Sequence, residues 1–330
     1  MLMIAISVII CAHNPRRDYF RRVLEALREQ TVPMDQWELL VVDNASTEPL
    51  AKWADISWHP QARHIREETL GVAWARVRGI AEAKAELLVF VDDDTVFNRD
   101  YLAHAIAIAG KHPDLGTWSG TVRLAFDQPP PEWTRAYWKF FWVREVQQDA
   151  QSGARSHDRA ATAWGGGMCL RREVGLFYRQ QWLHSPVRQI FGPRGQAIIG
   201  GEDTDLALSA CDMGMTTGVF RRLEITHLIP ADRMSEEYLL RVCKGAATSA
   251  LLMQLVRGTP VRRLPQGFKW RTRFLYDCAR KWGRRRRFYL AEVRGKRDAL
   301  RIFAAAHASK EGHNNTPSPT LVAREHHPGH

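Results

Sequence analysis

Three adjacent carboxylates, Asp92-Asp93-Asp94, directly follow an apolar run at residues 86–91. Like charges this close together repel one another unless a cation neutralises them. A hard divalent ion such as Mg²⁺ or Mn²⁺ takes oxygen ligands of this kind and would bridge them to a diphosphate. Alternatively, one of these carboxylates caps a helix that begins around residues 98–103. The triplet alone leaves a metal site and a helix cap equally open.

Two further groups of acids occupy similar places in the chain. Asp43 follows the apolar run 38–42, where its carboxylate would accept a hydrogen bond from a nucleotide base or ribose, or would hold an Asx-type turn without ligand. Glu202-Asp203-Thr204-Asp205 follows two glycines and precedes a helical pattern at residues 206–213. Carboxylates there either cap the helix or act as a general base toward an acceptor hydroxyl. Asp205 fits the cap, whereas Asp203 is harder to explain in that way.

Several common nucleotide and hydrolase motifs are missing from the sequence. The first expected strand–helix turn, residues 11–17, contains no glycine, so the G-x-G-x-x-G cradle for a dinucleotide is absent. The chain also has no G-x-x-x-x-G-K-[ST] loop, no G-x-S-x-G elbow and no H-E-x-x-H pair. A bound nucleotide would therefore need a metal at its phosphates, and the acid triplet could hold one.

The elements that position these acids alternate between strand and helix. Residues 4–11 form a continuous β-branched run, which is typical of a parallel strand covered on both faces. Phe20, Val23, Leu24 and Leu27 then form one stripe of an amphipathic helix. The pattern continues with a strand at 38–42, a helix at 72–83 and a strand at 86–91. This order predicts an α/β fold with a parallel sheet, in which ligands bind beyond the carboxyl ends of the strands.

Composition and cysteine usage set the class of protein. The chain has 330 residues, of which 45% are hydrophobic and 25% charged, which excludes a wholly disordered or fibrous chain. Its five cysteines are widely spaced and contain no C-x-x-C pair, which indicates buried thiols in a reducing compartment. The apolar amino terminus lacks the basic region of a signal peptide, and we expect no helix that spans a membrane. These features predict a cytoplasmic protein.

The positive charge is concentrated near the carboxyl end. The formal net charge is +11, and sixteen Lys or Arg stand against three acids between Arg257 and Arg301. Aromatic residues alternate with these arginines, as in helices that bind an anionic bilayer surface. Nucleic acid and a merely solvated helical face are the alternatives.

Six short motifs, taken in their order and spacing, resemble the inverting glycosyltransferases of family 2, which have the GT-A fold. They are Ser7-Val8-Ile9-Ile10-Cys11-Ala12-His13-Asn14, Gln30-Thr31, Val41-Val42-Asp43-Asn44-Ala45-Ser46-Thr47, Gly71-Val72-Ala73-Trp74-Ala75-Arg76, Phe90-Val91-Asp92-Asp93-Asp94 and Gly201-Glu202-Asp203-Thr204-Asp205-Leu206. The similarity covers residues 4–230, roughly two thirds of the chain. It implies a Rossmann-like, mostly parallel sheet flanked by helices, followed by a basic helical extension.

The same resemblance assigns a role to individual residues. It implies that Asp203 is the general base, with Glu202 beside it, and that Asp94 and His227 hold Mn²⁺ or Mg²⁺ on the diphosphate. A core or surface role for His227 is equally open. The residues that would bind the nucleotide-sugar are Asn14, Asp43 (at the base), Gly71, Arg76, Asp92 (at the ribose or phosphate) and Asp93. Candidates on the acceptor side are Trp133, Trp164 and Gly166, although the aromatic run 133–142 is also compatible with a core.

The resemblance further predicts the reaction and the domain plan. We expect metal-assisted single displacement of a sugar from a nucleotide-diphospho-sugar, UDP-linked, onto a glycan or lipid-linked acceptor. Residues 1–256 would be the GT-A domain, with a nucleotide-sugar half at 1–110 and an acceptor half at 111–256. Residues 257–305 would be a basic amphipathic segment that contacts the inner face of the membrane, and 306–330 a disordered tail. A sugar-phosphate nucleotidyltransferase and a non-enzymatic nucleic-acid-binding protein are the alternative functions.

Overall fold

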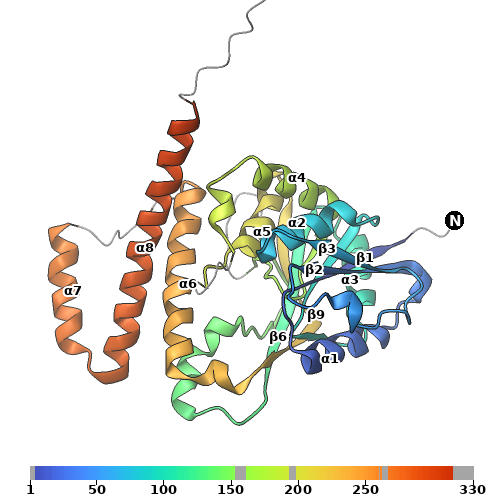
Figure 1. Cartoon of the computed structure of the whole chain (residues 1–330), viewed down its shortest axis with the longest axis horizontal. Helices are drawn as coiled ribbons and strands as arrows, with labels where there is room; N and C mark the ends of the chain where they lie inside the picture. Colours follow the sequence, from blue (N-terminus) through green and yellow to red (C-terminus); the bar gives the residue numbers. More distant parts are fainter. Residues whose placement is uncertain (1–3, 153–160, 193–197, 260, 262–266, 315–330) are drawn as a thin grey trace, which may run out of the picture.

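A nine-stranded sheet with helices on both sides forms the body of the protein (Figure 1). The computed structural model describes residues 4–152, 161–192, 198–259, 261 and 267–314. The strand order is β3-β2-β1-β4-β8-β6-β9-β5, and β7 pairs with β9. The predicted α/β architecture is therefore confirmed.

The first half of the sheet contains only parallel pairs, as the sequence pattern predicts. Its strands are β1 (Ile6–Ala12), β2 (Trp37–Asn44), β3 (Ala62–Glu67) and β4 (Leu87–Asp92), and its helices are α1 (Arg17–Arg28) and α2 (Val72–Glu82). β1 and β2 are buried along their whole length, which explains their continuous apolar sequences. The sequence pattern did not reveal β3, because this edge strand is polar and only partly buried.

The second half adds antiparallel pairs and carries the remaining site residues. Its strands are β5 (Thr95–Phe97), β6 (Leu115–Phe126), β7 (Ala150–Ser152), β8 (Cys169–Arg171) and β9 (Thr216–Ile229). Its helices are α3 (Tyr101–Lys111), α4 (Arg172–Leu183) and α5 (Glu202–Asp212). The 3-10 helices η1 (Met34–Gln36) and η2 (Leu50–Lys52) belong to the first half, and η3 (Glu132–Phe141), η4 (Arg188–Ile190) and η5 (Ala231–Met234) belong to the second. Strand β8 lies antiparallel to both β4 and β6 and so joins the two halves into one sheet.

Three helices follow the sheet: α6 (Glu236–Val256), α7 (Phe268–Arg280) and α8 (Gly283–Asn314). Helix α8 packs along α6, where Phe288, Ala291 and Ala299 are buried. Thr248 Oγ1 of α6 donates a hydrogen bond to the carbonyl oxygen of Gly295, 3.0 Å away. Most of the described part of the expected basic segment is thus helical, in α7 and α8, and α8 is packed against α6.

The sequence predicts a disordered tail at residues 306–330. This prediction is wrong for the first part of the tail, because α8 continues as a helix to Asn314. The rest of that tail, 315–330, lies outside the described residues, as do Arg262 and Arg263 of the basic segment.

One expectation about membrane spans is corrected by α6. Contrary to the sequence prediction, this helix is long and apolar enough to cross a membrane, with a mean hydropathy of 1.3 in its most apolar window. However, 39% of that window is buried inside the protein. Since the core helix of a soluble protein meets the same criterion, length and hydropathy alone do not place α6 in a membrane.

The close approach of α8 to α6 predicts opposite effects for two glycine substitutions. A Cβ on Gly295 would lie 2.2 Å from the carbonyl oxygen of Lys244, whereas a Cβ on Gly110 of α3 would meet nothing within 4 Å. Helix propensity favours alanine at both positions by about 0.5–1 kcal/mol. We expect Gly110→Ala to raise the free energy of unfolding and Gly295→Ala to lower it by about 1–3 kcal/mol, measured by urea denaturation. Equal stabilisation by both substitutions would contradict the packing of α8 on α6.

Candidate active site

The buried guanidinium of Arg76 joins the acids of the two halves. Arg76 lies on α2, and its side chain is 5% exposed. Its Nη2 atom lies 3.2 Å from Asp92 Oδ1, and its Nη1 atom lies 3.0 Å from Glu202 Oε1. Burial works against the charged form, but the charges of Asp92, Glu202 and Asp203 outweigh it and raise the pKa of Arg76. The acid triplet and the later acid pair therefore share one site, as the sequence predicts.

A run of three glycines fills the space between these charged groups. The amide of Gly165 donates a hydrogen bond to Asp203 Oδ2 at 3.0 Å. A Cβ on Gly165 would lie 2.7 Å from Arg76 Nη2, and one on Gly166 would lie 3.1 Å from Asp92 Oδ2. Gly167 has a φ of +78°, which disfavours any side chain. The candidate Gly166 thus lies at the site, and the absence of side chains lets the backbone pass between the carboxylates.

Glu202 and Asp203 occupy the first turn of α5 and are each 7% exposed. Asp203 Oδ1 accepts a hydrogen bond from the amide of Thr204 at 2.7 Å. Burial, together with the nearby charge of Asp203, raises the pKa of Glu202 although Arg76 opposes the shift. Glu202 Oε2 is buried and has no hydrogen-bond partner among the described residues. This oxygen is enclosed by the protein.

The prediction that Asp205 caps α5 is wrong. Its side chain is fully buried, with Oδ2 lying 3.2 Å from Arg188 Nη1 and Oδ1 lying 2.8 Å from Arg257 Nη2. Burial of a carboxylate in this way requires cationic partners. Arg257, the first basic residue of the carboxyl-terminal segment, therefore has a structural role.

Asp94 is held by an imidazole and a guanidinium that come from beyond the first half of the sheet. Its Oδ2 atom lies 3.3 Å from Nε2 of His227, on β9, and 3.0 Å from Nη1 of Arg233, on η5. Burial favours the neutral acid, but the contacts with His227 and Arg233 outweigh it and lower the pKa of Asp94. The proposed capping role is wrong for Asp94, because Asp100 stands at the N-cap of α3.

The middle carboxylate of the triplet behaves differently. Burial and the neighbouring charges of Asp94 and Asp92 raise the pKa of Asp93. Burial, partly offset by Arg76, also raises the pKa of Asp92. Unequal environments therefore relieve the repulsion within the triplet.

The donor set at Asp94 fits a metal that is shared with a ligand. Among the residues that the structure describes, no three His, Cys, Asp or Glu side chains form a complete metal site. Asp94 and His227 do converge and offer a carboxylate oxygen and an imidazole nitrogen. Nucleotide-bound Mg²⁺ characteristically takes one or two carboxylates and completes its shell with phosphate oxygens and water. Asp94 and His227 would therefore hold a cation together with a diphosphate.

Asp43 organises a turn at the end of β2. Its Oδ1 atom accepts a hydrogen bond from the amide of Ser46, and its Oδ2 atom accepts one from the amide of Leu50, both at 3.0 Å. Arg66 Nη1 lies 2.8 Å from Oδ2. Although burial opposes the shift, these hydrogen bonds lower the pKa of Asp43. The Asx-type turn, one of the two alternatives for Asp43, is therefore present. A contact between Asp43 and a nucleotide base stays a prediction.

Asn14 and Gly71 lie in neighbouring loops at the same edge of the sheet. Asn14 Oδ1 accepts a hydrogen bond from the amide of Thr47 at 2.8 Å. Gly71 has a φ of +138° and donates its amide hydrogen to Asn44 Oδ1 at 2.7 Å. Sequence reasoning missed Asn44, although it stands beside Asp43 in the same motif, because neither spacing nor periodicity reveals a loop-to-loop contact. It also missed Arg233, for which the motifs carry no signal.

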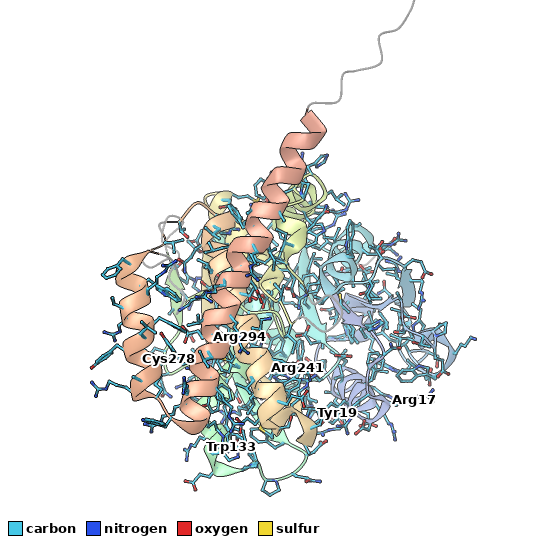
Figure 2. All side chains as sticks on the ribbon, turned by 60° about the vertical axis from the view of Figure 1, so that its left-hand side comes forward. Arg17, Tyr19, Trp133, Arg241, Cys278 and Arg294 are labelled. Atoms are coloured by element: carbon cyan, nitrogen blue, oxygen red, sulfur yellow. The ribbon has the colours of Figure 1, made fainter. Side chains whose placement is uncertain are left out.

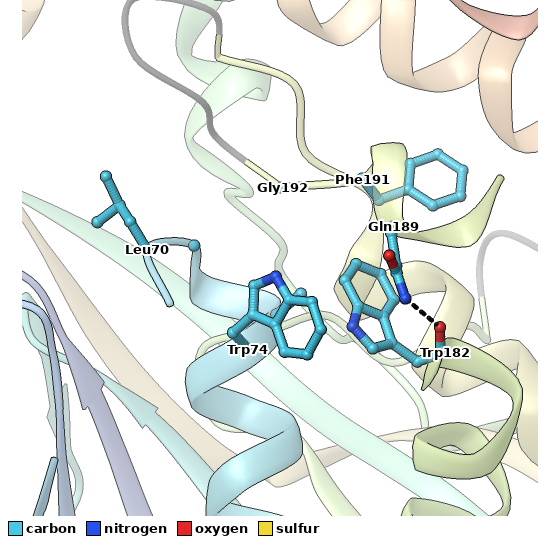
Figure 3. Close-up of a pocket in the computed structure, with 8 residues that line it drawn as sticks. Leu70, Trp74, Trp182, Gln189, Phe191 and Gly192 are labelled. Atoms are coloured by element: carbon cyan, nitrogen blue, oxygen red, sulfur yellow. Dashed lines mark hydrogen bonds between the residues drawn. The ribbon is translucent and has the colours of Figure 1, made fainter. Parts of the chain in front are cut away.

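A small hollow lies beside Gly71, where α2 faces α4 (Figure 3). The indoles of Trp74 and Trp182 meet edge to face with centroids 6.2 Å apart. Phe191 also lines the hollow, and it touches the start of α5, since a Cβ on Gly201 would lie 3.2 Å from its ring. Aromatic side chains thus surround the loops that lead into α2 and α5, the helices that carry Arg76 and the two acids.

The acceptor-side candidates fall in two places. Trp164 precedes the glycine run, and Arg144 Cζ lies 3.3 Å from the centre of its ring. Trp133 lies on η3 instead, under Arg284 of α8 at 3.9 Å. Phe141 of η3 is buried, in accord with the core alternative for this aromatic run.

The chain is similar to known proteins in sequence and in fold. Residues 7–173 match the family model described as Glycosyl transferase family 2. The glycosyltransferase AglE of Haloferax volcanii is 31% identical over 213 residues, which make up 63% of this chain and 62% of AglE. The chain spans less than two thirds of the length of the curated relatives that it matches.

Two solved structures share the fold. The crystal structure of Staphylococcus aureus TarS 1–349 in complex with UDP-GlcNAc has a TM-score of 0.53 and 14% identity, and the match covers 94% of this chain and 92% of that TarS fragment. The mannosyltransferase PcManGT from Pyrobaculum calidifontis, in complex with GDP-Man and Mn²⁺, has a TM-score of 0.52 and 19% identity. The match covers 95% of this chain and 76% of the PcManGT chain. These likenesses show a GT-A type fold. Together with the family match over half of the chain, they lead to one conclusion: this protein belongs to glycosyl transferase family 2.

Proposed function

We propose that this protein transfers a sugar from a nucleotide-diphospho-sugar to a hydroxyl group of an acceptor, with inversion at the anomeric carbon. The observation that carries the proposal is the Arg76 bridge, with Asp92 at one end and Glu202 at the other. This bridge holds the candidate base Asp203 near the acids that would receive the diphosphate. Family membership and the nucleotide-sugars bound to TarS and PcManGT support this function.

Asp94 and His227 would hold Mn²⁺ or Mg²⁺ at the diphosphate end of the site. When bound, the metal supplies Lewis-acid stabilisation of the negative charge on the departing nucleoside diphosphate. Arg233, 3.0 Å from Asp94, adds a fixed positive charge at the same place. We propose a UDP-linked donor, as in the TarS complex, and GDP-linked sugars are the alternative to be tested.

Asp203 is the group that takes the proton from the acceptor hydroxyl. Its carboxylate is kept in one orientation by the amides of Gly165 and Thr204. The hydroxyl oxygen attacks the anomeric carbon while the bond to the diphosphate breaks on the opposite side, so the configuration inverts. Glu202 is a weaker candidate for the base, because one of its oxygens is tied to Arg76. Its second oxygen is buried within the protein.

The acceptor itself is proposed to be a glycan or a lipid-linked glycan, with Trp164 and Gly166 on the acceptor side. We further propose that the reaction takes place in the cytoplasm. The five cysteines support a reducing compartment, because all of them are free thiols.

Asp203→Asn should separate chemistry from donor binding. The amide keeps the shape of the side chain and one of its two acceptor oxygens but is no base, so we expect hydrolysis of the preferred donor to fall by roughly 10²–10⁴-fold. The affinity for the donor, measured by calorimetry with UDP-GlcNAc and GDP-mannose, should change less than about threefold, because the nucleotide contacts remain. Asp35→Asn, at an exposed position of η1, is the matched control and should leave both quantities unchanged. Unaltered turnover in Asp203→Asn would exclude it as the base.

Asp94→Asn should uncouple Mn²⁺ from the nucleotide. A ligand at one hundred times its Kd stabilises the native state by about 2.7 kcal/mol, so UDP with Mn²⁺ should raise the Tm of the unaltered protein by several degrees. We expect UDP without Mn²⁺ to give a clearly smaller shift. In Asp94→Asn, and more weakly in His227→Gln, the added effect of Mn²⁺ should disappear. A Mn²⁺ effect of full size in Asp94→Asn would show that the metal binds elsewhere.

A further inference from the structure

Helix α7 lies at the outer edge of the molecule, with α8 and α6 between it and the sheet (Figure 1). Its inner side packs on α8: the rings of Phe274 and Tyr289 stack with centroids 6.1 Å apart, and Arg297 Cζ of α8 lies 5.1 Å from the centre of the Trp270 ring. Figure 2 brings this region forward and shows side chains of α7 that project away from the rest of the protein. The outer side of α7 is therefore a free surface of the chain.

Large apolar side chains occupy that free surface. Phe268 is 79% exposed, Leu275 is 66% exposed, and Trp282, in the turn to α8, is 77% exposed. These are the three most exposed large hydrophobic side chains among the residues described. Their spacing of seven residues places Phe268 and Leu275 on one face of α7, and Trp282 lies two residues beyond the end of that helix. An apolar group exposed to this extent marks an interaction site.

Arginines surround the apolar group. Arg271, Arg273 and Arg280 are exposed on α7, and Arg285 and Arg286 are exposed at the start of α8. Asp277 is the one acid of α7, and its carboxylate is already paired with Arg273 and Lys281. The surface thus combines apolar tips with an excess of positive charge, the combination that binds the boundary between lipid headgroups and acyl chains of an anionic bilayer.

We propose that the outer face of α7 and the turn to α8 bind the surface of an anionic membrane. Phe268, Leu275 and Trp282 enter the headgroup region, and the surrounding arginines contact lipid phosphates. Exposed aromatic rings and arginines would also suit nucleic acid, but the aliphatic side chain of the apolar group, Leu275, neither stacks on bases nor binds phosphate. Burial in the bilayer gives all three apolar side chains a favourable environment. This surface goes beyond the proposed transfer reaction and would hold the enzyme where lipid-linked acceptors are found.

Flotation of the full-length protein with vesicles tests this proposal. Vesicles of phosphatidylcholine mixed with phosphatidylglycerol should carry the protein, and vesicles of phosphatidylcholine alone should carry much less. A triple variant, Phe268→Ser with Leu275→Ser and Trp282→Ser, should bind the anionic vesicles at least about tenfold more weakly. A charge variant, Arg271→Gln with Arg285→Gln and Arg286→Gln, should lose a similar factor at low salt and less at high salt.

The matched control is Leu176→Ser with Leu183→Ser, which removes two exposed leucines from α4 and should leave vesicle binding unchanged. Circular dichroism and donor hydrolysis should be unaltered in the triple variant, because its three residues lie outside the active site. Loss of hydrolysis in Asp203→Asn with normal flotation would test the reaction separately from the membrane surface.

Three results would overturn the proposal. The first is full vesicle binding by the triple variant. The second is a protein that does not bind vesicles but does bind duplex DNA or RNA, as measured by fluorescence anisotropy, when the triple variant loses this nucleic-acid binding. The third is that light scattering shows a dimer for the unaltered protein and a monomer for the triple variant, and that lipid changes neither result. The surface would then be a contact between two copies of the chain.

Discussion

The site depends on one buried positive charge, the guanidinium of Arg76. Carboxylates removed from water are stable in their charged form only beside a cation, and Arg76 serves both Asp92 and Glu202. Without it, the end of β4 and the start of α5 would repel each other. The position of Arg76 follows from the left-handed turn at Gly71, which begins α2, and its contacts require Gly165, where a side chain would collide with the guanidinium. A single ion-pair network therefore holds the acids of the two halves together within the site, in a sheet that β8 makes continuous.

The partners of Asp94, His227 and Arg233, are more exposed to solvent than Arg76. The side chain of Arg76 is 5% exposed, whereas that of Arg233 is 30% exposed. Arg76 is thus enclosed as a permanent part of the site, while His227 and Arg233 meet Asp94 at the more open side. This difference suits a site in which the ion pairs of Arg76 hold the carboxylates in place and the residues around Asp94 bind a charged ligand. The hollow lined by Trp74 and Trp182 lies where α2, the helix that carries Arg76, faces α4, and its aromatic rings give it an apolar lining.

Much of the site could be predicted from the sequence, because its acids follow buried strands or a glycine bend. Buried parallel strands have continuous apolar sequences, so β1, β2 and β4 were recognisable, and the acids after them had to meet at one edge. The edge strand β3 was not recognisable, since half-buried polar residues leave no period. Asp205 was misinterpreted as a cap because its partners Arg188 and Arg257 are 17 and 52 residues away, and ion pairs over such separations leave no local pattern. The packing of α8 on α6 was hidden for the same reason: the residue that permits it, Gly295, stands among arginines and lysines.

The most direct test of the central claim is an anomalous-scattering map from crystals of the chain grown with UDP and Mn²⁺. The account predicts one Mn²⁺ peak about 2 Å from Asp94, with the diphosphate on the side of that metal that faces Asp203 and Arg76 still bridging Asp92 and Glu202. A Mn²⁺ peak away from Asp94, or a diphosphate bound where Asp203 cannot reach the anomeric carbon, would contradict it.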